Sequence, residues 1–543
     1  MKLLRTILLV FLVVGLVFLH PSTGSVQLVR IDKGTPGLEE IFKARDMEVV
    51  QELATCYLGR LDREDVLALR TSGVAVTILD RDAADRIYLL VRSESARTTV
   101  DLRKRGRVVS LEPRTFLFWT GAGDPSAALP SGLPRKRLPA SSIVPYLRAY
   151  PAAPAAARAA VRDPRVGAIV DQVSRDNLKA LIKTLQDFQT RRTGTAGCDA
   201  AAAFIHDYFH MNGVEAEVQE YPTGGDAETV VGELRGSAFP DDIVIVCAHF
   251  DSTSTEPETL APGADDNASG VAAVMEAARI LVRYPTDYTV RFLAFSGEEQ
   301  GLYGSEAYAR AAKAANERIV GVVNMDMIAY ADAMPEDLEI FVNGASSWMG
   351  NRLFQDAAEY ADLTVRTRID PSMVYSDHAS FWDRGFPALL AIEDVPIQNP
   401  YYHKTGDTLD TLDLDFCAQA AKTALATVAV LAQPVRFGPP PPARLEARSS
   451  FFSSLLGTRK NVYLSWAPQS NVVGYNIYRT DIPHSNHEKL NDRPVTELKY
   501  ADRGVASGMW HYYVITAVGQ DGVESNFSRQ VEVPPVPPRQ GAE

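Results

Sequence analysis

Between about residues 171 and 434, short apolar runs alternate with longer amphipathic stretches. Five apolar runs are typical of strands buried in a parallel sheet: residues 243–248, 289–295, 319–325, 338–342 and 388–392. Five stretches have apolar residues at helical spacing: residues 178–190, 200–211, 268–282, 302–315 and 412–431. Strands that alternate with helices predict an α/β domain with a mostly parallel sheet covered by helices on both faces.

The region before this domain, residues 26–160, has a weaker pattern. Short β-branched runs at residues 74–79 and 87–91 indicate strands, and residues 60–71 indicate a helix. The end of the region is rich in Pro and Ala, which is typical of a linker. We predict a small α+β module, either an accessory domain or a prosegment.

The first 25 residues have the pattern of a secretory signal peptide. Lys2 and Arg5 precede an apolar run at residues 7–19, and small and polar residues follow it. The run is shorter than the roughly 20 residues that span a membrane. We therefore predict export, to the periplasm or the extracellular medium, with no stable membrane span once residues 1–25 are removed.

The C-terminal part carries strand patterns only. Four prolines at residues 439–442 indicate a stiff linker, residues 435–442, before a β-sandwich at residues 443–535. This segment resembles a fibronectin type III domain: Trp466 in VYLSW, the run GYNIYR, and Tyr512 in HYYVITAV match strands of that family. Such a domain could contact a surface or a polymer.

Composition excludes several classes of function. The chain of 543 residues is 46% hydrophobic and 23% charged, as in ordinary globular proteins. Its 55 Lys and Arg against 68 Asp and Glu give a formal charge of −13, which argues against a nucleic-acid partner. Four cysteines with no CxxC pair exclude a disulfide scaffold and a thiolate zinc site.

Residues that bind metals or move protons follow the predicted strands, where open α/β sheets bind their ligands. They lie in five segments: HFD (His249, Asp251), PGADDNASG (Asp265, Asp266), SGEEQG (Glu298, Glu299), NMDM (Asp326) and YYHKTGDT (His403).

The residue types in these segments indicate a metal site. Two imidazoles with several carboxylates suit zinc or a similar divalent ion, and one shared carboxylate suits two ions. Asp251 lies two residues after His249 and faces the same way in an extended chain, so it can orient the imidazole. Of two adjacent glutamates, one can bind metal while the other moves protons. We expect Asp377 and His378 in the wall of the pocket.

Taken together, these segments resemble those of the M28 family of zinc aminopeptidases in order, spacing and residue type. The resemblance covers about residues 171–434 and implies the zinc-peptidase fold, with a mixed, mostly parallel sheet. It places the metal ligands, none of them substituted, on five residues: His249, Asp265, Glu299, Asp326 and His403.

The family pattern implies two Zn²⁺ ions per chain. Asp265 would bridge them, His249 and Asp326 would complete one site, and Glu299 and His403 would complete the other. The general base falls on Glu298, and Asp251 matches the aspartate that orients the histidine. The implied activity is hydrolysis of N-terminal residues from peptides or proteins by an activated water.

Other functions stay open at this point. A carboxypeptidase of the same family would need cations for the substrate carboxylate, and Arg366, Arg368 and Arg384 are candidates. A glutaminyl cyclase would use one zinc, and a non-catalytic binding or adhesion protein could share the fold. A serine hydrolase is disfavoured because no GxSxG motif occurs. His206 and His210 imitate a metal motif, but the glutamate is missing, which favours a plain helix face.

Overall fold

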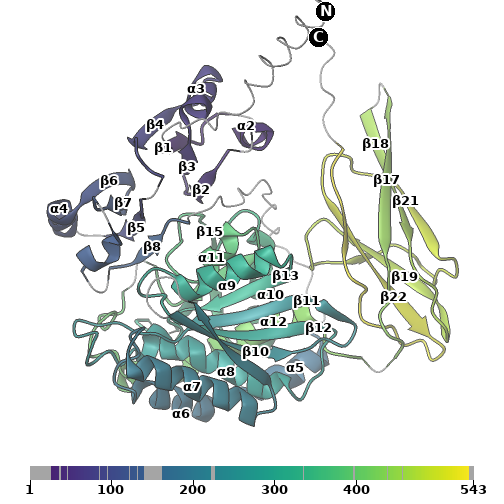
Figure 1. The fold of residues 1–543 in the computed structure, drawn as a ribbon. Helices are drawn as coiled ribbons and strands as arrows, with labels where there is room; N and C mark the ends of the chain where they lie inside the picture. The colour runs from purple at the N-terminus through teal and green to yellow at the C-terminus, as the bar shows by residue number, and fades with distance from the viewer. Residues whose placement is uncertain are drawn as a thin grey trace, which may run out of the picture. The chain divides into compact units, whose positions relative to one another are not determined.

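A computed structural model describes residues 26–536 except 36–37, 46, 85, 94–95, 122, 131–132, 140–161, 222–226, 334, 396–397, 437 and 455–456 (Figure 1). The predicted signal peptide and most of the predicted Pro- and Ala-rich linker lie outside the described residues. The chain divides into two compact units. One contains Met1–Ala128 and Arg137–Pro145, and the other contains Leu129–Lys136 and Tyr146–Glu543.

The described residues up to Arg137 contain helices and two small sheets, and the small α+β module there stays a prediction. The strand orders of the two sheets are β2-β3-β1-β4 and β6-β7-β5-β8. Helix α3 begins at Arg63, later than expected, because the Asp62 side chain caps it by accepting the N–H groups of Glu64 and Asp65. The elements are β1 (Gln27–Asp32), α2 (Leu38–Arg45), β2 (Val49–Glu52), β3 (Cys56–Leu61), α3 (Arg63–Thr71), β4 (Val76–Asp80), β5 (Leu89–Arg92), α4 (Ala96–Arg105), β6 (Arg107–Glu112), β7 (Thr115–Trp119) and β8 (Arg135–Arg137).

The second unit is built on an eight-stranded sheet of order β15-β14-β16-β13-β11-β12-β10-β9. The central strands β16, β13, β11 and β12 run parallel, and β10, β9 and the β14–β16 pair add antiparallel contacts. This confirms the predicted mixed α/β class. The strands are β9 (Glu215–Tyr221), β10 (Ala227–Leu234), β11 (Phe239–His249), β12 (Tyr288–Phe295), β13 (Arg318–Met325), β14 (Asp337–Val342), β15 (Thr364–Ile369) and β16 (Ala388–Ile392).

Helices cover both faces of this sheet (Figure 1). Apolar side chains of α5, α6, α7, α8, α10 and α12 form one core with the sheet, and those of α9 and α11 form another. The helices are α5 (Pro164–Val170), α6 (Arg175–Gln186), α7 (Ala196–Met211), α8 (Gly270–Leu281), α9 (Tyr303–Ala314), α10 (Ser347–Tyr360), α11 (His378–Asp383) and α12 (Leu414–Ala432). Among the described residues, α12 alone is long and apolar enough to span a membrane, and 78% of its apolar window is buried.

A short segment ahead of the first helix of this unit is bonded to its core. Leu129–Lys136 groups with the second unit. Lys136 Nζ lies 2.7 Å from Asp383 Oδ2 at the end of α11, and the two side chains are only 3% and 5% exposed. The ion pair is therefore part of the interior.

The C-terminal part of the second unit is a β-sandwich, as the strand patterns predicted. Its sheets have the orders β17-β18-β21 and β20-β19-β22-β23, and Trp466, Ile477 and Tyr513 lie in the core between them. The resemblance to fibronectin type III stays a prediction. The strands are β17 (Glu446–Ser454), β18 (Gly457–Ser465), β19 (Val472–Thr480), β20 (Glu488–Lys489), β21 (Lys499–Val505), β22 (His511–Gly519) and β23 (Val531–Val533).

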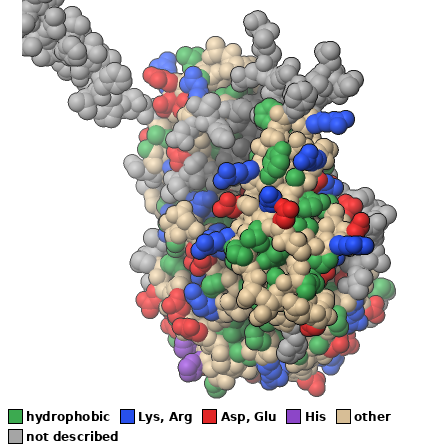
Figure 2. Space-filling model, turned by 90° about the vertical axis from the view of Figure 1, so that its right-hand side faces the viewer, with side chains coloured by type: hydrophobic (Ala, Val, Ile, Leu, Met, Phe, Trp, Pro, Cys, Tyr) green, Lys and Arg blue, Asp and Glu red, His purple; other side chains and the backbone are tan. Residues whose placement is uncertain are grey.

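Charges of both signs are mixed on the surface. Figure 2 shows Lys and Arg side chains interspersed with Asp and Glu side chains over one face of the molecule. That nucleic acid is not a partner stays a prediction from composition.

Candidate metal centre

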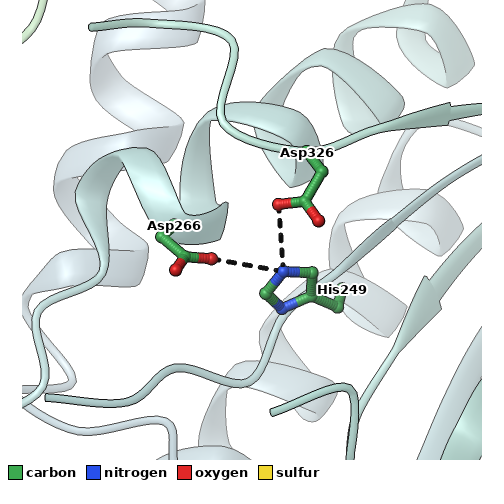
Figure 3. Close-up of side chains that lie close together, drawn as sticks. All are labelled: His249, Asp266 and Asp326. Atoms are coloured by element: carbon green, nitrogen blue, oxygen red, sulfur yellow. Dashed lines mark hydrogen bonds and ion pairs between the residues drawn. The ribbon is translucent and has the colours of Figure 1, made fainter. Parts of the chain in front are cut away.

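His249 ends β11, the central strand whose apolar residues are buried on both sides. Its Nε2 lies 3.2 Å from Asp326 Oδ1 and 3.3 Å from Asp266 Oδ1. Figure 3 shows both carboxylates pointing at this one ring nitrogen. Asp326 follows β13, the neighbouring parallel strand, which brings the two residues to the same edge of the sheet.

A second group forms around His403. Its Nε2 lies 3.0 Å from Asp266 Oδ2 and 3.2 Å from Glu299 Oε2. The ring of Tyr402 stacks on the imidazole at 3.7 Å between centroids and so holds its orientation. Glu299 follows β12, on the other side of β11.

Asp266 belongs to both groups. Its two oxygens face different histidines, and in each group of three the candidate ligand atoms lie within 4.8 Å of one another. The structure therefore brings together four of the five predicted ligands, His249, Glu299, Asp326 and His403, around a carboxylate that the sequence analysis had not chosen.

The prediction that Asp265 bridges the two groups is wrong in this geometry. Asp265 Oδ1 accepts the N–H of Ala329 at 2.9 Å, and its Oδ2 accepts the Asn399 side-chain amide at 3.0 Å. Asp266 instead points into the centre, because its own backbone is not helical, with φ −104° and ψ 88°. Spacing alone does not say which of two adjacent residues in such a turn faces inward.

Asp407 holds the turn that carries both aspartates. Its two carboxylate oxygens accept the backbone N–H groups of Asp265 at 2.9 Å and of Asp266 at 3.0 Å. Burial and the neighbouring carboxylate of Asp265 raise the pKa of Asp407 to about 8. The motif YYHKTGDT contained this residue, but nothing in its spacing identified the role.

Asp251 lies where the sequence suggested, beside the inner nitrogen of His249. Its carboxylate is 3.5 Å from His249 Nδ1, and its backbone oxygen is 3.1 Å from the same atom. The carboxylate also accepts the backbone N–H groups of Glu298 and Glu299, each at 3.3 Å. One buried side chain therefore orients both the imidazole and the two glutamates.

Glu298 is a buried acid beside the two groups. Burial raises its pKa well above the usual value, His249 opposes the shift, and Glu299 adds to it. Burial likewise raises the pKa of Glu299, against the opposing effect of His403. A carboxyl group whose affinity for protons is raised is suited to proton transfer near neutral pH.

Charges determine the protonation of the two histidines. Burial alone would lower the pKa of His249, but the carboxylates of Asp326 and Glu298 outweigh it and raise the pKa well above the usual value. Glu299 and Asp266 likewise outweigh the effect of burial on His403 and raise its pKa well above the usual value. A cation bound among these groups would replace the protons and leave both imidazoles neutral, as metal ligands must be.

Ser376 is a further residue that sequence reasoning missed. Its hydroxyl donates to Asp326 Oδ2 at 2.6 Å and accepts from the Asn324 side-chain amide at 2.8 Å. The neighbouring Asp377 and His378 are fully buried, and their place in the wall of a pocket stays a prediction. His378 Nε2 lies 2.7 Å from the backbone oxygen of Met373, and burial lowers the pKa of its imidazole to about 3.

Other candidates from the sequence lie outside the centre. Arg366, Arg368 and Arg384 are each ion-paired, with Asp337, Glu339 and Glu306 respectively. His206 and His210 lie on α7, with parallel rings 6.5 Å apart. The four cysteines are free and buried.

The donor set fits a pair of divalent cations. Two imidazoles and three carboxylates converge, one carboxylate is shared, and the buried Glu299 Oε1 has no hydrogen-bond partner in the described part of the chain. Nitrogen and oxygen donors in this proportion suit zinc. Carboxylates gathered out of water repel one another unless cations or protons compensate them.

Comparison with known proteins agrees with this site. Residues 229–428 match the model of peptidase family M28, and this stretch contains every residue of the two groups. The chain therefore carries a peptidase M28 domain, as its motifs predicted.

The relatives and solved structures extend the match. A probable zinc metalloprotease of Pyrenophora teres f. teres is 29% identical over 336 residues, which cover 50% of this chain and 69% of that protein. The uncharacterized protein YfbL of Escherichia coli is 29% identical over 252 residues, covering 40% and 76%. The structure of LapB from Legionella pneumophila covers 64% of this chain and 100% of its own, with a TM-score of 0.51 and 17% identity, and therefore shares the fold.

Proposed function

We propose that this protein is an exported, zinc-dependent aminopeptidase that removes N-terminal residues from peptides or proteins. The observation that carries the proposal is the Asp266 carboxylate, which has one oxygen toward His249 and the other toward His403. The peptidase M28 match and relatives named probable zinc metalloproteases support zinc as the metal. Two ions per chain follow from the shared carboxylate.

The chain's own residues would share the chemistry as follows. Zinc held by the two groups supplies Lewis acidity, which lowers the pKa of a water and polarises the scissile carbonyl. Glu298 accepts the proton of the attacking water and delivers it to the leaving amine. Asp251 keeps Glu298 in place through the backbone N–H of that residue.

The partners of the candidate arginines support an aminopeptidase over a carboxypeptidase. A carboxypeptidase needs a cation for the terminal carboxylate, and the three arginines suggested for this role are bound to acidic partners.

Glu298→Ala tests the proposed base. Zinc content should stay at the wild-type value while turnover falls about 10²- to 10⁴-fold, the usual contribution of general acid–base catalysis. Glu215→Ala, at an exposed position on the edge strand β9, is the matched control and should leave both quantities unchanged. Near-normal turnover of Glu298→Ala would reject this role.

Digestion of an unbiased peptide library by the purified protein tests the class of substrate. Shortening from the N-terminus is expected, and shortening from the C-terminus would establish the carboxypeptidase alternative. A protein that binds two zinc ions and cleaves nothing would be a binding protein on the same fold.

N-terminal sequencing of protein recovered outside the cytoplasm tests the proposed export. Binding of the wild-type chain to a surface polymer tests the suggested role of the C-terminal sandwich.

A further inference from the structure

Arg191 is a fully buried arginine in the turn after α6, with an exposed fraction of 0%. Its guanidinium donates to four backbone oxygens: Nε to Phe250 at 2.7 Å, Nη1 to Leu185 at 3.1 Å and Pro262 at 2.6 Å, and Nη2 to Gly263 at 2.8 Å. We call this arrangement the Arg191 clamp. Every contact in it is to the backbone, so it fixes the path of the chain.

The clamp joins two segments that carry candidate metal ligands. Phe250 lies between His249 and Asp251, and Gly263 lies three residues before Asp266. The guanidinium therefore sets the distance between the end of β11 and the turn that supplies the shared carboxylate. Since planar guanidinium groups hold several acceptors in fixed directions, arginine suits this task better than lysine.

A hydroxyl group repeats the same connection beside the guanidinium. Ser252 Oγ accepts the backbone N–H of Arg191 at 3.1 Å and donates to the backbone oxygen of Ala261 at 2.8 Å. The segment after β11 and the segment before Asp266 are therefore linked twice through the Arg191 turn.

Gly263 explains how the guanidinium comes so close to the backbone. Its φ is +53°, and a Cβ built there would lie 2.9 Å from Arg191 Nη2, 2.6 Å from Ser252 Cβ and 2.4 Å from the backbone oxygen of Asp266. Any larger residue would push the clamp and the turn apart.

Thr193, two residues after Arg191, reaches the third segment of the centre. Its hydroxyl accepts the backbone N–H of Gly297 at 2.8 Å and lies 3.2 Å from Asp251 Oδ2. Gly297 immediately precedes Glu298. One short turn thus contacts the segments of His249, Asp266 and Glu298.

We propose that Arg191 is a positioning residue that holds the His249 and Asp266 segments at the spacing required to bind two metal ions. The inference rests on the proposed metal role of those residues. It assigns a function in the site to a residue that would not itself touch metal or substrate.

Arg191→Lys and Arg191→Met test this inference, with zinc affinity measured by chelator competition. We expect at least a 10-fold loss of affinity for one of the two zinc ions, and a fall in kcat with little change in KM. Thermal unfolding of the zinc-free proteins separates this effect from general destabilisation. Arg352→Lys is the matched control, because Arg352 is also buried and bonded as a fork, to Asp356 on α10; it should lower the melting temperature and leave zinc affinity unchanged.

Ser252→Ala keeps the test decisive if the Arg191 variants do not fold. It removes only the second link and should weaken zinc binding in the same direction by a smaller factor. Wild-type zinc affinity in a folded Arg191→Lys, or in Ser252→Ala if the Arg191 variants do not fold, would overturn the inference. Failure of the wild-type protein to bind zinc would instead overturn the proposed function.

Discussion

Asp251 accepts the backbone N–H of Glu298 at 3.3 Å while its carboxylate lies 3.5 Å from His249 Nδ1. Asp251→Asn would turn an amide group toward these donors. We expect zinc affinity and turnover each to fall about 10- to 100-fold, as for other residues that orient a metal ligand. Chelator competition and steady-state kinetics measure both. Asp199→Asn, at an exposed position on α7, should change neither, and an unaffected Asp251→Asn would contradict the role.

Asp266→Asn and Asp265→Asn form a matched pair that tests which aspartate is shared by the two groups. Asp266→Asn should bind fewer than two zinc ions and lose nearly all turnover, because the amide nitrogen that replaces one oxygen faces one of the two histidines and cannot bind a metal ion. Asp265→Asn should still bind two ions, since its oxygens accept from Ala329 and Asn399. Metal analysis after gel filtration gives the stoichiometry. The reverse outcome would restore Asp265 as the bridge.

Ser376→Ala should weaken the half of the site that contains Asp326. The hydroxyl donates to Asp326 Oδ2 at 2.6 Å, so its loss frees that carboxylate to rotate. We expect about a 10-fold loss of affinity for one zinc ion. Ser380→Ala removes another buried hydroxyl, which contacts Ser305 at 2.9 Å, and should bind zinc normally. Equal zinc affinity in Ser376→Ala and Ser380→Ala would contradict the proposed role of Ser376 in orienting Asp326.

Zinc should stabilise the fold measurably. In the zinc-free protein the buried carboxylates of Asp266, Glu299 and Asp326 lack their cations. At a zinc concentration of 100 times Kd, binding at one site adds about 2.7 kcal/mol to the free energy of unfolding. Scanning calorimetry with and without a chelator measures the shift in melting temperature. The shift should be smaller in Asp266→Asn. A melting temperature that does not depend on zinc would contradict zinc binding to the folded protein at this site.

Stability should fall in acid because of two histidines in the C-terminal sandwich. Burial lowers the pKa of His484 to about 4 and that of His487 to about 3, from the usual 6.5. Between pH 6.5 and about pH 4, the unfolded chain binds more protons at these histidines than the folded chain does. The free energy of unfolding is therefore unaffected by them above about pH 6.5 and declines as the pH falls toward 4.

Melting temperatures between pH 7 and pH 4 test this dependence. The double variant His484→Gln/His487→Gln should flatten the curve, whereas His206→Gln/His210→Gln on the surface of α7 should keep its slope. An unchanged slope in the first double variant would show that other groups cause the acid sensitivity.

The sequence predicted the parallel core well because buried strands carry a strong signal. The run at residues 388–392 matches β16, and the run at 243–248 lies within β11. Each of these two runs is apolar along its length since both faces of the sheet are covered. The same pattern predicted where the candidate metal ligands lie, because His249 and Asp326 come at the ends of such strands.

Edge elements and local turns could not be predicted in this way. Strand β9 has the sequence EAEVQEY and lies at the edge of the sheet, where polar side chains face water, so it gave no strand signal. Ser376 and Asp407 act through contacts between distant segments, which no local pattern encodes. Which of Asp265 and Asp266 faces the centre depends on backbone torsions within one turn.

Lys136 and Asp383 have a practical consequence for where this protein can be cut. The family match starts at residue 229 and the first helix of the unit at Pro164, so either point looks like a natural start for a recombinant fragment. Both would discard Lys136 and leave the buried Asp383 carboxylate without its counter-ion, a loss on the order of 3–5 kcal/mol. A fragment meant to fold and to be assayed should therefore begin upstream of residue 129.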